Sequence, residues 1–282
     1  MTLKNILLYQ AHGHTDFIHE AIYSILSLYQ VEKNAGMLFQ IVIYTDNAPY
    51  FQSFLPQEVR YQTLAPETVQ EWKSNPPFVH RVKIKMIEDC MLHFEGNILY
   101  MDTDTVFRES PLPLFEKIAD GKYIMHEKEG KLSNKSNPLF SKLARFFRKT
   151  PHFLNNSVTI TPDFEMFNAG VLGFSSKELQ KDISRILALS DTLYAQYPKH
   201  VMEQIAFTHY FSLQSLPETA QKEIYHYWFY KEFRKVLNGF FQKNKQKTQA
   251  ELLAKLPEIN PEKNYTPTKK PSFWNTIFGK RK

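Results

Sequence analysis

The stretch that decides the fold is Asn97-Ile98-Leu99-Tyr100-Met101-Asp102-Thr103-Asp104, an apolar run that ends in two aspartates separated by one residue. Alternate side chains of a strand point to the same side, so we expect the carboxylates of Asp102 and Asp104 to project together from the strand end. Hard divalent cations that work with phosphate substrates are commonly held by one or two carboxylates. The stretch therefore predicts a metal and nucleotide site. The competing interpretation is a buried strand that ends in a solvated turn.

Strands and helices alternate around this stretch. Short apolar segments that favour strands alternate with segments in which apolar residues recur at helical spacing. The expected strands are 6–9, 39–46, 59–64 and 166–174, and the expected helices are 17–29, 79–94, 177–197 and 200–211. Such alternation is typical of an α/β fold with an open, mostly parallel, Rossmann-like sheet flanked by helices. Ligands of these sheets bind at the carboxyl ends of the strands, where Asp46, Asp102 and Asp104 are expected.

Composition indicates a folded protein of a reducing compartment. The 282 residues are 43% hydrophobic and 15% aromatic, which favours a folded protein over a disordered one. No apolar run reaches the roughly 18 residues of a spanning helix, and the first residues lack the pattern of a secretory signal. The single cysteine, Cys90, excludes an intramolecular disulfide and is expected in the core. We therefore expect a cytoplasmic protein, with peripheral association at the inner face of the cell membrane.

The net charge of +6 indicates an anionic partner. Segment 231–247 combines apolar residues at helical spacing with cations, a pattern that predicts either a helix on an anionic membrane surface or a helix packed on the catalytic domain. Segment 273–278, flanked by lysines, favours the membrane surface. The aromatics are mostly periodic and core-like, so no nucleic acid is expected as a partner. We expect a catalytic domain at 1–235, with an active-site loop or inserted subdomain at 127–157, and a basic, amphipathic, partly flexible extension at 236–282.

Four separated segments carry a resemblance to a known family. They are Ile98 to Asp104, Phe167 to Leu172, the pair Glu203-Gln204, and His226 followed by Lys231. In this order they resemble the nucleotide-sugar glycosyltransferases of the GT-A fold, in particular those of family 8 and related bacterial polysaccharide transferases. The likeness covers residues 3 to 235 in element order. It implies a GT-A fold and a nucleoside diphosphate sugar, most commonly a UDP-sugar, as the donor.

The resemblance implies a divalent metal site. Asp102 and Asp104 match the metal-binding aspartates of the family, and Asp102 also approaches the donor ribose. His226 matches the late histidine that completes the site, and Lys231 the cation that contacts the diphosphate. The family usually has a glycine between these two and a longer spacing, which this chain lacks. Oxygen and imidazole ligands of this kind suit Mn²⁺ or Mg²⁺. The competing interpretation of His226 is a member of an aromatic cluster.

Residues near the donor sugar follow from the same resemblance. Asn168 and Gly170 match a loop beside the sugar, where the amide bonds hydroxyls and the glycine permits close backbone approach. Glu203 and Gln204 match an acid and amide pair near the reacting carbon. The competing interpretations are a strand with a turn glycine for the first pair and an ordinary polar helix face for the second.

Further candidates lie on the helix before Asp102 and at the first strand end. Lys85 occupies the place where related enzymes use a basic residue against phosphate or sugar, and Arg81 is the neighbouring candidate. Solvated surface charge is the competing interpretation for both. Tyr9 and Gln10 fall where this fold grips the nucleotide base.

Taken together, these features predict a metal-dependent hexosyltransferase. It would move a sugar from the donor to a hydroxyl of a glycan or lipid-linked acceptor, with retention at the anomeric carbon, in bacterial surface glycan synthesis. One alternative is a sugar-phosphate nucleotidyltransferase, which normally carries a Gly-rich basic loop that residues 10–16 do not provide. A second alternative is a non-catalytic module recruited to membranes through the basic tail.

Overall fold

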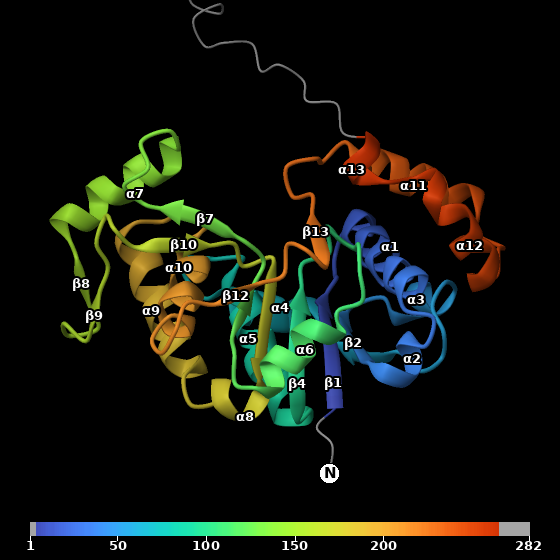
Figure 1. Cartoon of the computed structure of the whole chain (residues 1–282), viewed down its shortest axis with the longest axis horizontal. Helices are drawn as coiled ribbons and strands as arrows, with labels where there is room; N and C mark the ends of the chain where they lie inside the picture. The colour runs from blue at the N-terminus through green and yellow to red at the C-terminus, as the bar shows by residue number, and fades with distance from the viewer. Residues whose placement is uncertain (1–3, 265–282) are drawn as a thin grey trace, which may run out of the picture.

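The computed structural model describes residues 4–264, which form an α/β fold around a seven-stranded sheet (Figure 1). The strand order is β12-β6-β11-β4-β1-β2-β3, and every neighbouring pair is parallel except the two pairs that contain β11. The strands are β1 (Lys4–Gln10), β2 (Gln40–Thr45), β3 (Arg60–Thr63), β4 (Gly96–Met101), β6 (Ile124–Met125), β11 (Val171–Ser175) and β12 (Glu218–Thr219). The expected mostly parallel sheet with flanking helices is confirmed.

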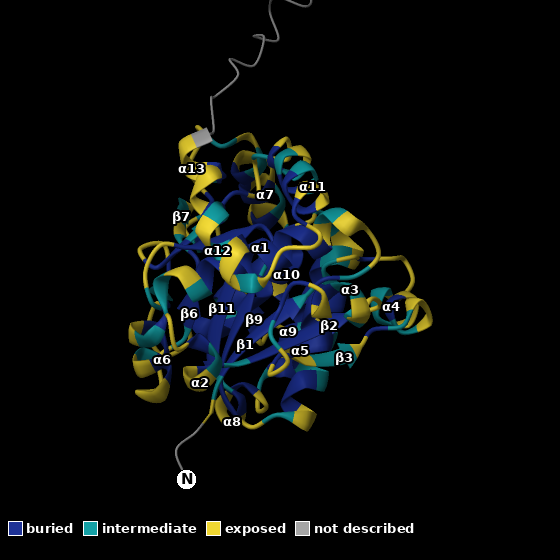
Figure 2. Ribbon diagram, turned by 90° about the vertical axis from the view of Figure 1, so that its right-hand side faces the viewer, coloured by how far each residue is buried: buried dark blue, intermediate teal, exposed yellow. Residues whose placement is uncertain are grey.

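Apolar side chains project from both faces of the central strands and form two cores. On β1, Leu7 and Tyr9 belong to one core with helix α1, and Ile6 and Leu8 belong to a second core with helices α5, α9 and α10. The main helices are α1 (Thr15–Val31), α5 (Arg81–His93), α6 (Leu112–Ala119), α9 (Ile183–Gln196) and α10 (Met202–Phe211). Figure 2 shows the buried sheet between helices whose outer faces are exposed. The alternation of a strand's side chains explains why β1 reads as a continuous apolar run.

Several expected elements are divided in the structure. The expected strand 166–174 is two strands, β10 (Glu165–Phe167) and β11, which belong to different sheets. The expected helix 177–197 is α8 (Ser176–Leu179) followed by α9. The remaining short helices are α2 (Ala35–Leu38), α3 (Ala48–Gln52) and α4 (Pro66–Lys73). Residues 168–170 lie between β10 and β11 and belong to neither strand. Their backbone is therefore free to leave the sheet at the carboxyl end of β4.

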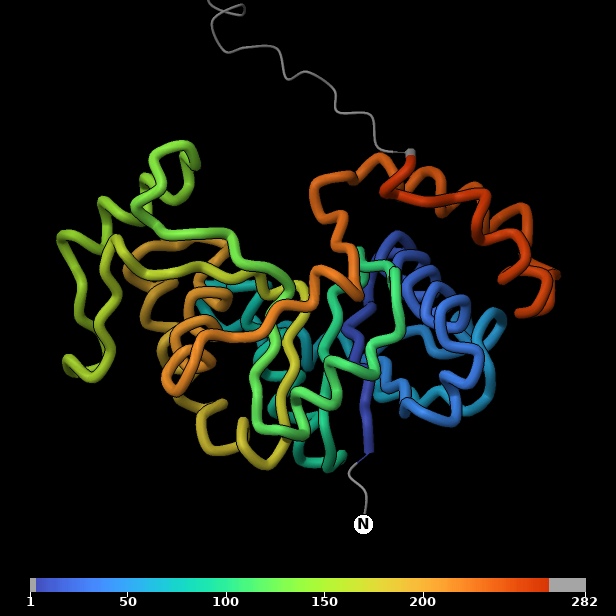
Figure 3. Tube along the Cα trace, in the orientation of Figure 1, coloured from blue at the N-terminus to red at the C-terminus, as the bar shows by residue number. Residues whose placement is uncertain are grey.

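Segment 127–157 forms an insertion with its own secondary structure. It contains β7 (Lys128–Lys131), α7 (Pro138–Lys149) and β8 (His152–Phe153), and β9 (Val158–Thr159), which pairs with β8, follows directly after it. Strand β7 pairs with β10, and α7 stands at one side of the molecule in Figures 1 and 3. Asn137 caps α7 by accepting from the amides of Leu139 and Phe140. The insertion thus has a fixed base next to the sheet.

Four helical segments follow β13 at the carboxyl-terminal end of the described chain, and the first two of them pack against α1. They are α11 (Phe233–Lys243), α12 (Gln249–Lys255), a 3-10 turn (Leu256–Glu258) and α13 (Pro261–Asn264). Phe233, Leu237, Phe240 and Phe241 are buried, and His19 of α1 stacks on Phe241. The apolar stripe of 231–247 is therefore covered by protein, as the second interpretation expected. Segment 273–278 lies outside the described residues. Within 4–264, no helix combines the length and apolar character needed to cross a bilayer.

Candidate metal and donor site

The Asp-x-Asp turn follows β4 directly. Strand β4 ends at Met101, so Asp102 and Asp104 lie in the turn that leads into β5 (Thr105–Phe107) and not in the strand itself. The Asp102 amide donates to the Gly170 carbonyl at 2.7 Å, and the Thr105 hydroxyl donates to the Asp102 carbonyl at 2.8 Å. The expected convergence of the two acids is present, but it comes from this hydrogen-bonded turn and not from strand alternation.

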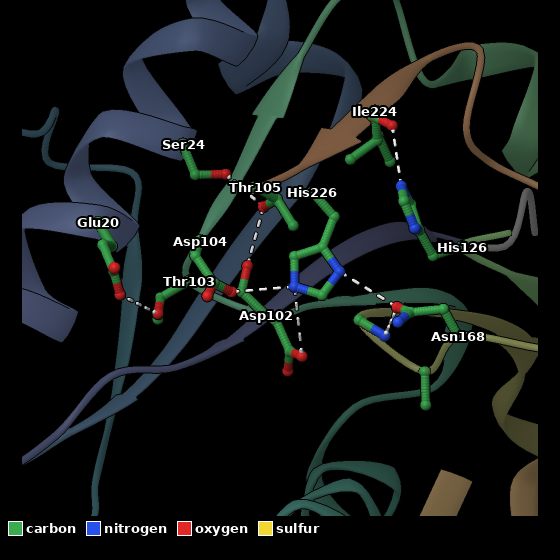
Figure 4. Close-up of polar contacts among 12 residues, drawn as sticks. Glu20, Ser24, Asp102, Thr103, Asp104, Thr105, His126, Asn168, Ile224 and His226 are labelled. Atoms are coloured by element: carbon green, nitrogen blue, oxygen red, sulfur yellow. Dashed lines mark hydrogen bonds and ion pairs between the residues drawn. The ribbon is translucent and has the colours of Figure 1, made fainter. Parts of the chain in front are cut away.

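His226 reaches the turn through a short antiparallel ladder. It ends β13 (Ile224–His226), which pairs with β5 so that His226 lies opposite Thr105. Its Nε2 is 3.0 Å from Oδ1 of Asp104 and 3.9 Å from Oδ2 of Asp102 (Figure 4). One ligand atom from each of the three side chains lies within 4.8 Å of the others. Two carboxylates and one imidazole at this separation fit a divalent cation.

The loop Asn168 to Gly170 fixes the orientation of the imidazole. The Gly170 amide donates to Oδ1 of Asn168 at 2.9 Å, which identifies that atom as oxygen. The same oxygen lies 3.1 Å from Nδ1 of His226 (Figure 4). Because a carbonyl oxygen only accepts, Nδ1 carries a proton, and Nε2 is the ring atom directed at the acids. A histidine held in this way presents Nε2 as a metal ligand.

Burial and charge have opposite effects on the pKa values of Asp104 and His226. Burial is the largest influence on both groups and disfavours their charged forms. The hydrogen bond and the charge of the partner outweigh it, so the pKa of Asp104 lies below its usual value and the pKa of His226 lies above its own. The Nε2 atom that contacts Asp104 is also the atom through which His226 would bind a cation.

Lys83, and not Lys85, is the basic residue of α5 in the site. Its Nζ lies 3.2 Å from Oδ1 of Asp102 and 3.4 Å from Oε1 of Glu203, and donates to the Ala169 carbonyl at 3.1 Å. Burial, the largest influence, lowers the pKa of Lys83, but the two carboxylates reverse the direction and raise it. The expectation for Lys85 is corrected, since its ammonium pairs with Glu88 and it lines neither site cavity. Residues two apart on a helix point in opposite directions.

Arg81 is likewise outside the site. Its guanidinium binds Asp191 and the Trp72 carbonyl.

Lys83 and Lys85 should contribute very different amounts to the stability of the fold. Replacing Lys83 by methionine leaves Asp102 and Glu203 without their buried cation, so we expect the free energy of unfolding to fall by about 3 kcal/mol. Replacing Lys85 by methionine removes a half-exposed pair and should change it by less than about 0.5 kcal/mol. Urea unfolding of the two variants measures the difference. Equal stabilities would contradict the placement of Lys83.

Glu203 and Gln204 lie in the first turn of α10, and both are buried. Gln204 Nε2 donates to Oε2 of Glu129 at 2.7 Å, and Asn168 Nδ2 donates to Oε1 of the same carboxylate at 3.1 Å. Glu129, on β7, thus holds both amides that the sequence placed near the sugar. It was missed because the pairing of β7 with β10 leaves no periodic signal in the sequence.

Lys231 approaches the cluster from the solvent side. Its Nζ lies 2.8 Å from Oδ2 of Asp104, and its side chain is 53% exposed. Next to it, Arg234 of α11 bonds the buried carboxylate of Glu20 at 2.7 Å. Glu20 also accepts from the Thr103 hydroxyl at 3.0 Å (Figure 4). The turn that carries the two acids is therefore tied to both α1 and α11.

The first strand end contributes Gln10 but not Tyr9. Gln10 lines a cavity beside Asp102, whereas Tyr9 is fully buried and its hydroxyl is 3.0 Å from that of Ser24. The expectation that Tyr9 contacts the base is corrected, because its side chain faces the α1 core and not the strand end.

Two adjacent cavities share the acids. The smaller, about 280 Å³, extends toward β1 and α1, and the larger, about 600 Å³, extends toward α7 and α10. The residues that line both are His80, Lys83, Asp102, Asp104 and Lys231. Asn168, Gly170, Glu203, Gln204 and His226 line the larger one only. A ligand that spans both cavities would cross the metal cluster at its middle.

His126 lies behind His226, with the two rings perpendicular and their centroids 5.2 Å apart. Its Nε2 is 3.2 Å from the Ile224 carbonyl (Figure 4). Burial, followed by the neighbouring charge of His226, lowers the pKa of His126 to about 3 from the ordinary 6.5. The ring is therefore neutral in the folded protein at neutral pH.

This neutral ring predicts an acid-sensitive fold. Between pH 6.5 and 3 the unfolded state binds a proton at His126 that the folded state does not, so stability falls as pH is lowered through that range. One such group contributes a slope of about 1.4 kcal/mol per pH unit. Unfolding at several pH values should show a shallower slope in His126→Gln, with the exposed His152→Gln as control. The same slope in both variants would contradict the assignment.

Comparison with known proteins shows the fold. No family model matches the chain, and no curated protein matches it. Among solved structures, the glycosyltransferase GlyE of Streptococcus pneumoniae TIGR4 is similar over 96% of this chain and 66% of its own, with a TM-score of 0.51 and 11% identity. An active-site mutant of LgtC covers 73% of this chain and 70% of its own at 15% identity, with a TM-score of 0.47.

Mouse xyloside xylosyltransferase 1 covers 74% of this chain and 82% of its own at 11% identity, with a TM-score of 0.48. The similarity to GlyE, together with the mostly parallel sheet, shows that the chain has the GT-A fold. At these identities the likeness does not single out family 8.

Proposed function

We propose that the chain is a metal-dependent glycosyltransferase that moves a sugar, a hexose from a UDP-sugar, to an acceptor hydroxyl. The observation that carries the proposal is the cluster of Asp102, Asp104 and His226, which lies at the carboxyl end of β4 between two cavities. In GT-A folds and other open α/β sheets, ligands bind at this edge. The smaller cavity would take the nucleotide and the larger one the sugar with its acceptor.

The residues of the cluster are suited to a departing diphosphate. A bound Mn²⁺ or Mg²⁺ would neutralise charge on the two phosphates as they leave the sugar. Lys231 is placed to add a positive charge from the solvent side, because it already contacts Asp104. The ammonium of Lys83 lies between Asp102 and Glu203 and supplies a positive charge to both carboxylates. The pair Glu203-Gln204 and Asn168 supply hydrogen-bonding groups to the larger cavity, where the sugar hydroxyls would bind.

We further propose retention at the anomeric carbon. The bond from that carbon to the phosphate oxygen breaks, and a bond to the acceptor oxygen forms on the same face. The acceptor proton passes to the departing diphosphate, so no carboxylate nucleophile is required. A glycan or lipid-linked acceptor in bacterial surface glycan synthesis suits this chemistry, with the basic tail near the inner face of the membrane.

The two alternatives have less support. A nucleotidyltransferase needs a basic loop after the first strand, and residues 10–16 provide no lysine or arginine. A non-catalytic module does not explain why two acids and a histidine converge between two cavities.

A ligand screen tests the proposal. Melting temperatures are measured with a panel of nucleotide sugars, each with MnCl₂, MgCl₂ or EDTA. We expect one UDP-sugar to raise the melting temperature only when metal is present, since a ligand that binds the folded state stabilises it by mass action. That donor should then be hydrolysed slowly in a metal-dependent reaction. If no nucleotide sugar has an effect with any metal, the proposal fails.

A further inference from the structure

The insertion that carries α7 has a cationic surface without counter-ions. The inner face of α7 is buried through Phe140, Leu143, Ala144 and Phe147. Its other side and the preceding loop expose six cations, which are Lys131, Lys135, Lys142, Arg145, Arg148 and Lys149. No acidic residue occurs between 131 and 149, and within residues 4–264 no ion pair involves any of the six. We call these six residues the α7 cationic surface.

Some lysines elsewhere on the molecule are paired with acids. Lys117 pairs with Glu218 at 2.9 Å, and Lys181 pairs with Glu178 at 2.7 Å. Six adjacent cations repel one another, and that repulsion is relieved when an anionic partner binds. The α7 cationic surface is therefore suited to binding an anion that extends over several residues.

A second group of cations lies on the same side of the molecule. In both Figure 1 and Figure 2, α7, α11 and α13 lie at the top, and the amino terminus lies at the opposite end. In and after α11, Lys235, Lys243 and Lys245 are exposed, and no ion pair within the described residues involves them. Two separated helices thus present positive charge in one direction.

Two exposed aromatic side chains lie in the loop that joins β13 to α11. Trp228 is 50% exposed and Phe229 is 40% exposed, and Trp228 also lines the larger cavity. In Figure 3 this loop, in orange, rises from the centre of the molecule toward the carboxyl-terminal helices at the top, the end at which α7 also lies. Aromatic residues next to exposed cations are typical of surfaces that insert shallowly into the interface of a bilayer.

We propose that this side of the molecule docks on an anionic membrane, with α7 and α11 on the lipid headgroups and Trp228 at the interface. Because α7 and α11 lie on the same side of the molecule, a planar anionic surface can contact both groups of cations at once. The mouth of the larger cavity would then face the bilayer. Resting on the proposed transferase function, this orientation assigns the acceptor to the class of membrane-anchored glycans or lipid-linked saccharides, which reach the site without leaving the bilayer.

The test compares two charge reversals in the full chain. One variant combines Lys142→Glu, Arg145→Glu and Arg148→Glu on α7. The matched control makes the same change in charge at the opposite end, with Lys122→Glu, Lys177→Glu and Lys181→Glu, where Lys122 lies beside α8. Melting temperatures show whether both variants fold. Binding is measured by co-sedimentation with vesicles of phosphatidylcholine, with and without phosphatidylglycerol.

We expect wild-type protein to prefer vesicles with phosphatidylglycerol, and more salt should weaken the binding. The α7 variant should bind these vesicles about 100-fold more weakly, since each lost cation costs roughly fivefold. The control variant should bind like wild-type protein. Equal binding by both variants would overturn the proposal, as would wild-type protein that ignores phosphatidylglycerol or that binds soluble polyphosphate but not vesicles.

A nucleotide titration separates this proposal from the transferase proposal. Metal-dependent binding of UDP is measured on the same variants without vesicles. If vesicle binding is absent while UDP binding is intact, the docking surface alone is wrong. If vesicles bind as expected while UDP does not, the docking surface stands, and both the transferase assignment and the acceptor class derived from it fail.

Discussion

Replacing Asp104 by asparagine is expected to weaken Mn²⁺ binding by at least about 100-fold, because loss of a group that merely supports a metal ligand already costs 10- to 100-fold. Asp104 is the acid that contacts both His226, at 3.0 Å, and Lys231, at 2.8 Å. The amide has nearly the same shape but no negative charge. The site would keep its geometry and lose the anion that the cation needs.

Electron paramagnetic resonance of free Mn²⁺ measures this loss, since the sharp signal of the free ion disappears on binding. The exposed Asp120→Asn, which makes the same chemical change outside the site, is the control and should bind like wild-type protein. Donor hydrolysis by Asp104→Asn should fall at least as far as metal affinity. An Asp104→Asn variant that binds Mn²⁺ normally would show that the cluster is not the metal site.

Replacing Gly170 by alanine is expected to weaken the same metal site by displacing the imidazole of His226. A Cβ at Gly170 would lie 2.2 Å from Cε1 and 2.3 Å from Nδ1 of His226, far inside contact distance. The imidazole is buried and cannot move away without losing its bonds to Asn168 and Asp104. We expect Mn²⁺ affinity to fall by at least about 10-fold and unfolding free energy to fall by about 1 to 3 kcal/mol.

Gly239→Ala is the matched control for this variant. Gly239 lies within α11, and a Cβ there would meet no atom within 4 Å. Alanine favours helix over glycine by about 0.5 to 1 kcal/mol, so this variant should be slightly more stable and bind metal normally. If Gly170→Ala were as stable and as metal-competent as Gly239→Ala, the close packing of Gly170 on His226 would be disproved.

The sequence allowed the sheet and the two acids of the cluster to be predicted because their signals are local. The apolar runs of β1, β2 and β4 are continuous, since both faces of these strands are buried. Asp102 and Asp104 follow one such run directly. His226 lies 122 residues after Asp104, and no pattern within the chain links it to the acids. Its place was predicted through the family resemblance.

The lysine of α5 could not be assigned from its charge alone. Lys83 is 6% exposed, and its ammonium lies between two acids. In sequence, such a residue looks the same as the solvated Lys85 two positions later. The position of Lys83 on the helix could have shown that it is buried. Lys83, Ile87 and Cys90 share one face of α5, and the last two are fully buried.

Tyr9 shows the same limit in a strand. Its position near a strand end suggested contact with a ligand, but the side of the sheet on which it lies depends on where α1 packs. That contact joins residues 15 apart, Tyr9 and Ser24, and is not visible in the alternation of β1 itself. Predicting the position of Glu129 would have required knowing that β7 pairs with β10, and the whole insertion separates these two strands in the sequence.

Calorimetric titration of UDP into the full chain, with Mn²⁺ and then with EDTA, tests the central claim most directly. If Asp102, Asp104 and His226 hold a cation that the diphosphate shares, UDP should bind at least about 10-fold more tightly with Mn²⁺. The difference should vanish in Asp104→Asn. Equal affinity of UDP with Mn²⁺ and with EDTA in the wild-type protein would contradict the account.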